Sequence, residues 1–222
     1  MRFYDAKVSV ARVAGDQGNE DRREIAGDAI RAAIRDWNTE HNWEFKFRED
    51  PSYTLASGDQ DIEVDGLKKV HTLRRTGDAK GVLQFYRMRT IDYSLRDQSS
   101  VGIPTVYTVI ENPTQNVVRV YPVPETDTDF HVSYYEEIQE PSDDDDEIDV
   151  PTRFLNALLA RAKYHYLMDK DSENIRLQLY DTLSSTLLRK AIRDDKKQPD
   201  EIEGMPSRND YGYAFGRLEE DF

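Results

Sequence analysis

Histidines are the side chains in this sequence best suited to metal binding or to proton transfer near neutral pH. The chain has four, at His41, His71, His131 and His165, and none is followed by another four residues later. A zinc site needs several ligands that converge on one point. The chain also lacks cysteine, which excludes thiolate ligands and disulfides. We therefore expect no metal site and no cofactor.

One acidic stretch, Asp61–Gly66, begins like a calcium-binding loop. The twelfth position of such a loop should be a glutamate that binds calcium through both oxygens, and here it is Thr72. Ile62 and Val64 alternate with charged residues, which is typical of a strand with one buried face. The sequence therefore predicts a charged strand followed by a turn.

A second acidic stretch contains four consecutive aspartates, Asp143, Asp144, Asp145 and Asp146. Their charge could attract divalent ions, but consecutive positions supply no defined ligand geometry. Nine acids and no base lie between residues 136 and 150. Such a run is usually solvated, so we predict an acidic loop over residues 136–149.

Nucleophile elbows, phosphate-binding loops and dinucleotide-binding glycine patterns are all missing from the sequence. The many carboxylates leave a glycosidase-like pair open, but nothing singles out two of them. We therefore expect that the protein is not an enzyme. A hydrolase with an unassigned carboxylate pair stays as an alternative, to be tested by changing single acids and measuring turnover.

Helical periodicity appears in three segments that could position functional surfaces. Apolar residues spaced by three and four predict a helix from about Asn19 to Glu40 and another from about Pro151 to Met168. A third stripe has its apolar residues four apart, at Ile175, Leu179, Leu183, Leu187 and Ala191. We expect residues 19–42 and 150–196 to form one helical bundle.

Short alternating segments separated by turns fill residues 43–135 and predict a β-module. Its first strand is expected at Trp43–Phe47 and to end before Pro51. An aromatic meander follows between Val101 and Tyr135, with almost no charge. The order of elements predicts an α+β fold, in which an antiparallel sandwich or barrel-like module is inserted into a bundle of three main helices.

The two ends of the chain lack a clear period. Residues 1–18 are interpreted as an N-terminal arm and residues 197–222 as an extended C-terminal tail. The tail carries aromatic side chains that could contact another protein, namely Tyr211, Tyr213, Phe215 and Phe222.

Composition indicates a hydrophilic protein with a thin core. Of 222 residues, 37% are hydrophobic and 33% charged, and the net charge is −14. A thin core is consistent with stability shared between subunits. The acidic balance argues against broad binding to phosphate backbones. No apolar run is long enough to cross a membrane, and the N-terminus is a poor secretory signal.

Positive charge is concentrated in one part of this acidic chain. Between Leu67 and Arg96 there are eight bases and two acids. This stripe could face DNA, or it could pair with an acidic neighbour within the chain or on the next subunit. We favour pairing over contact with DNA. Candidates for pairing between subunits are the bases Arg74, Arg75, Arg87 and Arg89 and the aspartates Asp143, Asp144, Asp145 and Asp146.

The succession of segments resembles a known family. DWNTEHNWEF is followed by YTLASGDQDIEVDGLKKV, GIPTVYTV, VVRVYPVPETDTDFHVSYY and VPTRFLNALLARAKYHYLMD. This order is similar to the head-to-tail adaptors of tailed bacteriophages, of the tail-tubular-protein-A type of short-tailed phages. The likeness covers about residues 20–195 and leaves the N-terminal arm outside. Its most specific parts are the Gly-x-Pro-x-x-Tyr strand and the Val-x-Val-x-Pro-x-Pro strand end.

The resemblance implies a structural protein of the virion, made in the host cytoplasm. It would form a ring of twelve copies between the portal and the nozzle or other tail proteins. The bundle would face the portal and line the DNA exit channel, and the tail would reach the portal or a neighbouring subunit. Double-stranded DNA would pass without sequence recognition, and no membrane would be involved.

A different class of function remains open beside this one. The β-module could bind a carbohydrate or a peptide, with exposed Trp43 or Tyr107 as the contact. That alternative predicts a monomer that binds its ligand in isolation, whereas an adaptor predicts a closed assembly.

Overall fold

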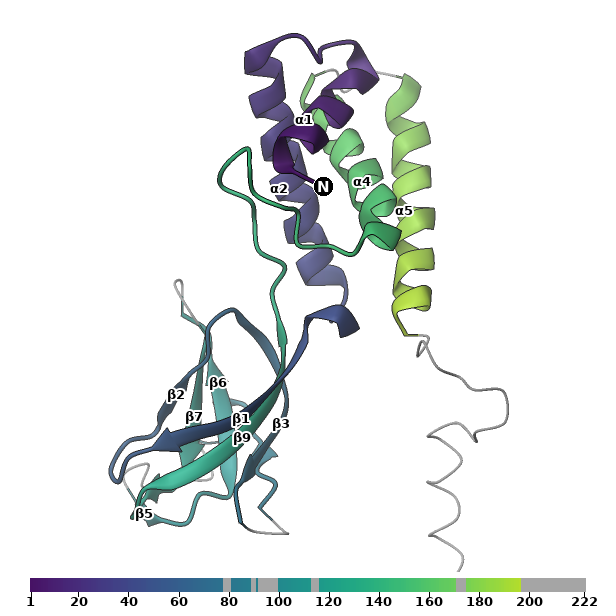
Figure 1. The fold of residues 1–222 in the computed structure, drawn as a ribbon. Helices are drawn as coiled ribbons and strands as arrows, with labels where there is room; N and C mark the ends of the chain where they lie inside the picture. The colour runs from purple at the N-terminus through teal and green to yellow at the C-terminus, as the bar shows by residue number, and fades with distance from the viewer. Residues whose placement is uncertain (78–80, 89–90, 92–99, 113–115, 171–174, 197–222) are drawn as a thin grey trace, which may run out of the picture.

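A computed structural model describes residues 1–77, 81–88, 91, 100–112, 116–170 and 175–196. Figure 1 shows a helical bundle at one end and a β-module at the other, joined by two passages of the chain. The α+β class predicted from the sequence is confirmed. The predicted tail, residues 197–222, and Arg89 lie outside the described residues.

Among the described residues, four helices form the bundle: α1 (Phe3–Ala11), α2 (Glu20–Glu40), α4 (Thr152–Lys170) and α5 (Ile175–Asp195). Asn19 caps α2, because its side-chain oxygen accepts a hydrogen bond from the Arg22 N–H at 3.2 Å. The three- and four-residue spacing of α2 turns Ile30, Ile34 and Trp37 fully into the core. Helix α2 was predicted from about Asn19 to Glu40, so its predicted start and end are correct to within one residue.

The N-terminal arm predicted for residues 1–18 is wrong. Helix α1 packs on α2 and α4, and Phe3, Ala6 and Val10 are fully buried in the bundle core. The short apolar stripe is interrupted by charge, which hid it in the sequence. The interrupting Lys7 is itself buried, because Glu24 and Asp144 both lie 2.8 Å from its amine.

Only the C-terminal part of the stripe predicted for α5 faces the bundle, where Ala191 is in the core and Leu187 packs against it. Ser184 and Ala191 are buried, whereas Leu179 and Leu183 are exposed. Residues four apart advance by roughly 40° around a helix with 3.6 residues per turn, so a long four-residue series winds from one face to another. The predicted five-residue stripe therefore could not stay on one buried face.

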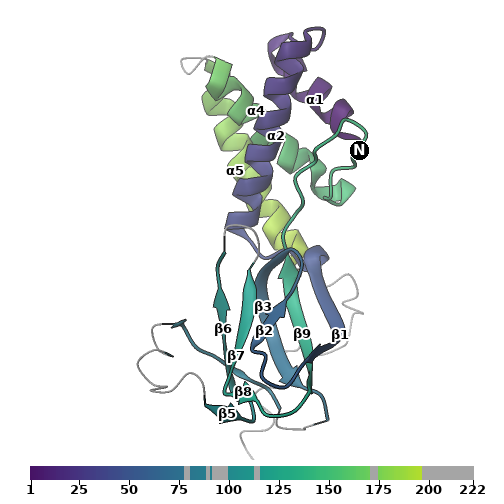
Figure 2. The ribbon, with the colours of Figure 1, turned by 90° about the vertical axis from the view of Figure 1, so that its left-hand side faces the viewer.

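In its described residues the β-module contains nine strands, which are β1 (Phe47–Leu55), β2 (Asp61–Glu63), β3 (Leu67–Arg75), β4 (Gln84–Phe85), β5 (Val101–Gly102), β6 (Val106–Ile110), β7 (Val117–Tyr121), β8 (Val123–Pro124) and β9 (Thr128–Glu136). One sheet has the order β1-β9-β3 and the other β2-β7-β6-β4, with β5 and β8 forming a small pair. Figure 2 shows the two larger sheets facing each other.

The sheets of the β-module are mixed rather than purely antiparallel. Strands β1, β9 and β3 pair antiparallel, as do β6 and β7, but the β4–β6 and β5–β8 pairs are parallel. Leu73, Val118, Val120, Phe130 and Val132 are fully buried between the sheets. The Val101–Tyr135 meander therefore supplies much of the module's core.

The predicted strand at Trp43–Phe47 is also wrong. Glu44–Lys46 forms a short 3-10 helix, and Trp43 enters the core of the bundle instead of a sheet. Strand β1 starts at Phe47 and continues through residue 51, where the proline was expected to end it. That strand lies at a sheet edge and changes register between Asp50 and Tyr53, a setting in which proline is tolerated.

Candidate assembly surfaces

Aromatic rings join the bundle to the start of the β-module. Trp37, near the end of α2, stacks on Trp43 with ring centroids 4.5 Å apart. The Trp43 ring nitrogen donates a hydrogen bond to the Trp37 carbonyl at 3.1 Å. Phe45 and Phe154 lie 5.6 and 5.8 Å from Trp43, so α2, α4 and the chain leading into β1 share one cluster. This cluster gives the junction a defined geometry.

The end of α5 is held at the same junction by a buried carboxylate. One Asp195 oxygen accepts a hydrogen bond from the Glu44 N–H at 2.8 Å and lies 3.2 Å from the His41 Nε2 atom. The Asp195 side chain is completely buried. Lys68 of β3 donates to the His41 carbonyl at 2.5 Å. These contacts place the last residues of α5 against both parts of the molecule.

This junction should make stability depend on pH. Burial lowers the pKa of His41 more than the hydrogen bond and charge of Asp195 raise it, so the pKa lies below its ordinary 6.5. The unfolded chain then takes up the proton first as the pH falls. We expect the free energy of unfolding to decrease below pH 6.5 and to level off below the folded-state pKa of His41.

The measurement is urea unfolding of the wild type and of His41→Gln between about pH 8 and about pH 5. The difference in unfolding free energy between the two proteins should change across this range, because the other histidines cancel in the comparison. A difference that is constant with pH would contradict the prediction.

The acidic stretch is a loop, as predicted, but it is only partly solvated. Ile138 and Ile148 are buried in the bundle core. Asn38 of α2 donates to the Ile138 carbonyl at 3.0 Å and accepts from the Ile138 N–H at 2.9 Å. Arg31 of α2 donates to the Pro141 carbonyl at 3.0 Å. The loop therefore follows α2 as a strap.

Charges of the acidic loop are largely matched within the chain. Asp144 pairs with Lys7 at 2.8 Å and Asp145 with Arg2 at 3.3 Å. Burial lowers the pKa of Lys7, but hydrogen bonds to Asp144 and Glu24 outweigh it and the net pKa is raised. Each partner of Lys7 is distant in the sequence, so its role could not be read from spacing.

The four consecutive aspartates have separate roles. Asp146 accepts hydrogen bonds from the N–H groups of Asp143 and Ser142, at 2.9 and 2.8 Å, and these bonds lower the pKa of its carboxyl. Asp143 and Asp145 are exposed. The chain thus uses Asp146 to shape the loop and leaves other carboxylates facing outward.

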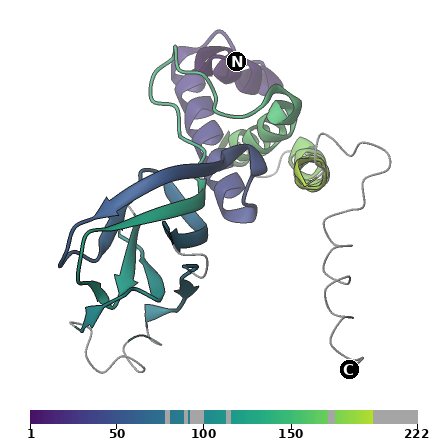
Figure 3. The same ribbon diagram turned by 60° about the horizontal axis from the view of Figure 1, so that its bottom comes forward.

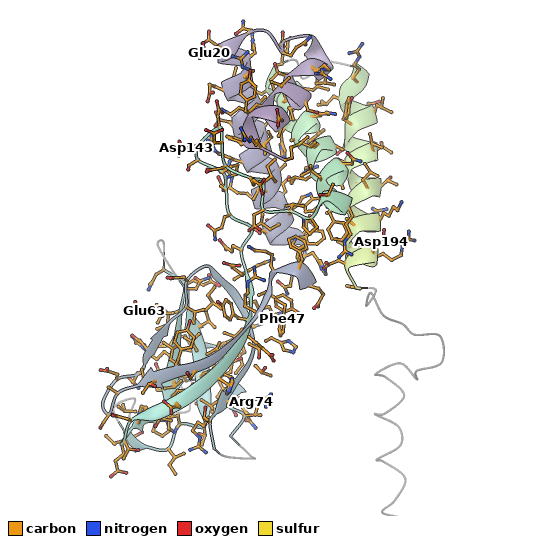
Figure 4. The ribbon with its side chains drawn as sticks, viewed as in Figure 1. Glu20, Phe47, Glu63, Arg74, Asp143 and Asp194 are labelled. Carbon is orange, nitrogen blue, oxygen red and sulfur yellow. The ribbon has the colours of Figure 1, made fainter. Side chains whose placement is uncertain are left out.

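Those of the bases predicted to pair with these aspartates that the structure describes lie elsewhere in the molecule. Figure 4 shows Arg74 in the β-module and Asp143 beside the bundle. Arg74 and Arg87 are exposed, and Arg75 lines a groove of about 370 Å³ beside β4 and β6. The structure does not bring these bases to Asp143–Asp146 within one chain, so their pairing between copies stays a prediction.

The β-module also exposes large apolar side chains. Val82, Phe85, Tyr86, Val101 and Ile103 are exposed, and the first three flank or line the groove beside β4. The residues named for a ligand-binding module do not join them, because Trp43 and Tyr107 are 2% and 5% exposed. Those two aromatic side chains therefore cannot provide the contact expected of that alternative.

The histidines have structural partners. His165 and Arg161 both hydrogen-bond one Asp36 oxygen, at 2.8 and 2.6 Å. Burial raises the pKa of Asp36, but these bonds outweigh it and the net pKa is lowered. Within the described ranges no three acidic or histidine side chains gather as metal ligands. No described helix has the length and hydropathy needed to cross a membrane.

Comparison with models of known protein families gave a match that covers most of the chain. The sequence model of a family described as SU10 adaptor protein matches residues 1–204. That range covers the β-module and the whole bundle, including α1. The resemblance noted above had left the residues of α1 outside. A search among curated proteins found no match.

Proposed function

The chain belongs to the SU10 adaptor protein family, a family of phage head-to-tail adaptors, and from that premise we propose that it forms a ring between the portal and the tail. The protein is a structural component of the bacteriophage virion. Twelve copies, as the tail-tubular-protein-A resemblance implies, would surround the channel through which the genome leaves.

In this proposal the bundle faces the portal and lines the channel, and the β-module faces the nozzle or other tail proteins. The family match over residues 1–204 is the observation that carries it, because the match includes both parts of the molecule. The exposed apolar side chains in and beside the groove of the β-module offer a surface for a second protein. A contact with the portal through Tyr211, Tyr213, Phe215 and Phe222 of the tail belongs to the same proposal.

The negative net charge of the protein supports a channel through which DNA passes without being bound. The net charge is −14, and a protein holds DNA by neutralising phosphates with lysine and arginine. A channel wall with few unpaired bases would let double-stranded DNA move without sequence recognition. The bases at Arg74 and Arg87 would then serve contacts with tail proteins rather than with DNA.

Mixing the full chain with portal rings of the same phage tests the proposal. We expect a closed ring of adaptor on the portal by electron microscopy and mass photometry, and weaker incorporation of a chain lacking residues 197–222. Circular dichroism of the shortened chain should show unchanged helix and strand content, because the proposal treats residues 197–222 as an extended tail that is not part of the domain. Failure of the full chain to bind portal rings at any salt concentration would contradict the proposal.

A further inference from the structure

We propose that the outer face of α5 on one copy binds the acidic loop and α1 of the next copy. This inference rests on the proposed ring and names the two surfaces that would close it. It assigns the exposed aspartates a partner different from the β-module bases expected from sequence.

One stripe of α5 is exposed along most of the helix. It consists of Leu179, Leu183, Thr186, Lys190 and Arg193, all five of which are exposed. Their spacing alternates between four and three residues, so they share one face of the helix. This alternation is the pattern by which a helix packs along a partner surface. The bundle itself is contacted by the opposite face, through Ser184, Ala191 and Asp195.

The stripe has an apolar half and a cationic half. Leu179 and Leu183 are 64% and 40% exposed. Lys190 and Arg193 follow, and Arg189 is exposed beside them. Arg193 lies 4.0 Å from a carboxylate oxygen of the adjacent Asp194, whereas Arg189 and Lys190 form no ion pair within the part of the chain that the structure describes. A surface that fits this stripe needs apolar contacts and carboxylates together, which argues against DNA phosphate as its partner.

Such a surface lies on the same protein. Met1 and Tyr4 of the α1 end are exposed apolar side chains, and Asp143 and Glu147 of the acidic loop are exposed carboxylates. Backbone hydrogen bonds hold the two segments together. The Tyr4 N–H donates to the Asp144 carbonyl at 3.1 Å, and the Ile148 N–H donates to the Met1 carbonyl at 3.0 Å.

The two surfaces lie on opposite sides of the bundle. Figure 1 shows the acidic loop on the side away from α5, and Figure 3 shows the same separation from another direction. A contact between two different surfaces on opposite sides of a subunit repeats from copy to copy and can close into a ring. Opposite charge on the two surfaces would also fix the direction of the contact. A second copy is therefore the partner that the charges and positions fit.

Charge reversal in both halves provides the test. Lys190→Glu with Arg193→Glu should weaken association of the full chain, as should Asp143→Lys with Glu147→Lys, each by about tenfold or more. The chain that carries all four substitutions should recover association to within about threefold of the wild type, because opposite charges face each other again. Sedimentation velocity at several salt concentrations, alone and on portal rings, gives the association constants.

A matched control reverses two exposed bases of the β-module, Arg74→Glu and Arg87→Glu, and should leave association unchanged. Loss of association in this control, with none in the α5 variant, would overturn the inference and favour the β-module bases. If the four-substitution chain is not rescued and the α5 variant loses DNA binding, α5 faces DNA and the inference is wrong. If the α5 variant and the loop variant form rings as readily as the wild type, the proposed interface is wrong but the proposed function stands. A wild type that stays monomeric with portal overturns the proposed function as well.

Discussion

Replacing Trp43 by alanine should lower the free energy of unfolding by about 3–5 kcal/mol, the range observed for large-to-small substitutions of buried aromatic residues. Trp43 is 2% exposed and stacks on Trp37 at 4.5 Å. The substitution removes this stack, the hydrogen bond to the Trp37 carbonyl and the contact with Phe154. Neighbouring rings come from α2 and α4, so a cavity here cannot close without moving helices.

Urea unfolding followed by far-ultraviolet circular dichroism measures the change. The control is Phe85→Ala, in which a side chain that is 53% exposed on β4 is shortened in the same way. The control should change the unfolding free energy by less than about 1 kcal/mol. Equal effects of the two substitutions would show that Trp43 is not part of the bundle core.

The position of Trp43 also shows how much of the fold could be predicted from the sequence. Alternation of Trp43, Phe45 and Phe47 indicated a strand, because period two is its signature. The structure uses the first of these rings to fill the bundle, and the strand begins at Phe47. A short alternating segment cannot reveal that its first ring has a partner on a preceding helix. By contrast, α2 is long, strongly periodic and capped by Asn19, and its limits were predicted correctly.

The candidate surfaces show the same contrast between local patterns, which can be read from the sequence, and long-range partners, which cannot. Positions of the charges in the chain could be read from the sequence, but not their partners. Lys7 and Asp144 are 137 residues apart in number and 2.8 Å apart in space, so no local pattern joins them. The acidic loop looked solvated for this reason, and its buried Ile138 and Ile148 were outnumbered by carboxylates. Long-range pairs of this kind depend on how α1 and α2 pack, which composition does not determine.

Shortening Phe3 to alanine should destabilise the chain by about 3–5 kcal/mol, a result opposite to that expected for a free arm. Phe3 is fully buried, and its ring approaches Gly27 of α2 so closely that a Cβ built on Gly27 would lie 3.1 Å from the Phe3 Cζ atom. The ring also lies 4.7 Å from the Lys7 amine. Loss of the ring therefore opens the contact between α1 and α2 and loosens the lysine that holds Asp144.

Tyr4→Ala is the matched control, since the next residue of α1 is 43% exposed and should change the unfolding free energy by less than about 1 kcal/mol. Deleting residues 1–11 should have a larger effect than Phe3→Ala, because Ala6, Val10 and Ala11 leave the core together. We expect the shortened chain to lose cooperative urea unfolding and to expose apolar surface to a fluorescent dye. A shortened chain with wild-type stability would make α1 an appendage, and the acidic loop that it holds would lose its defined place beside the bundle.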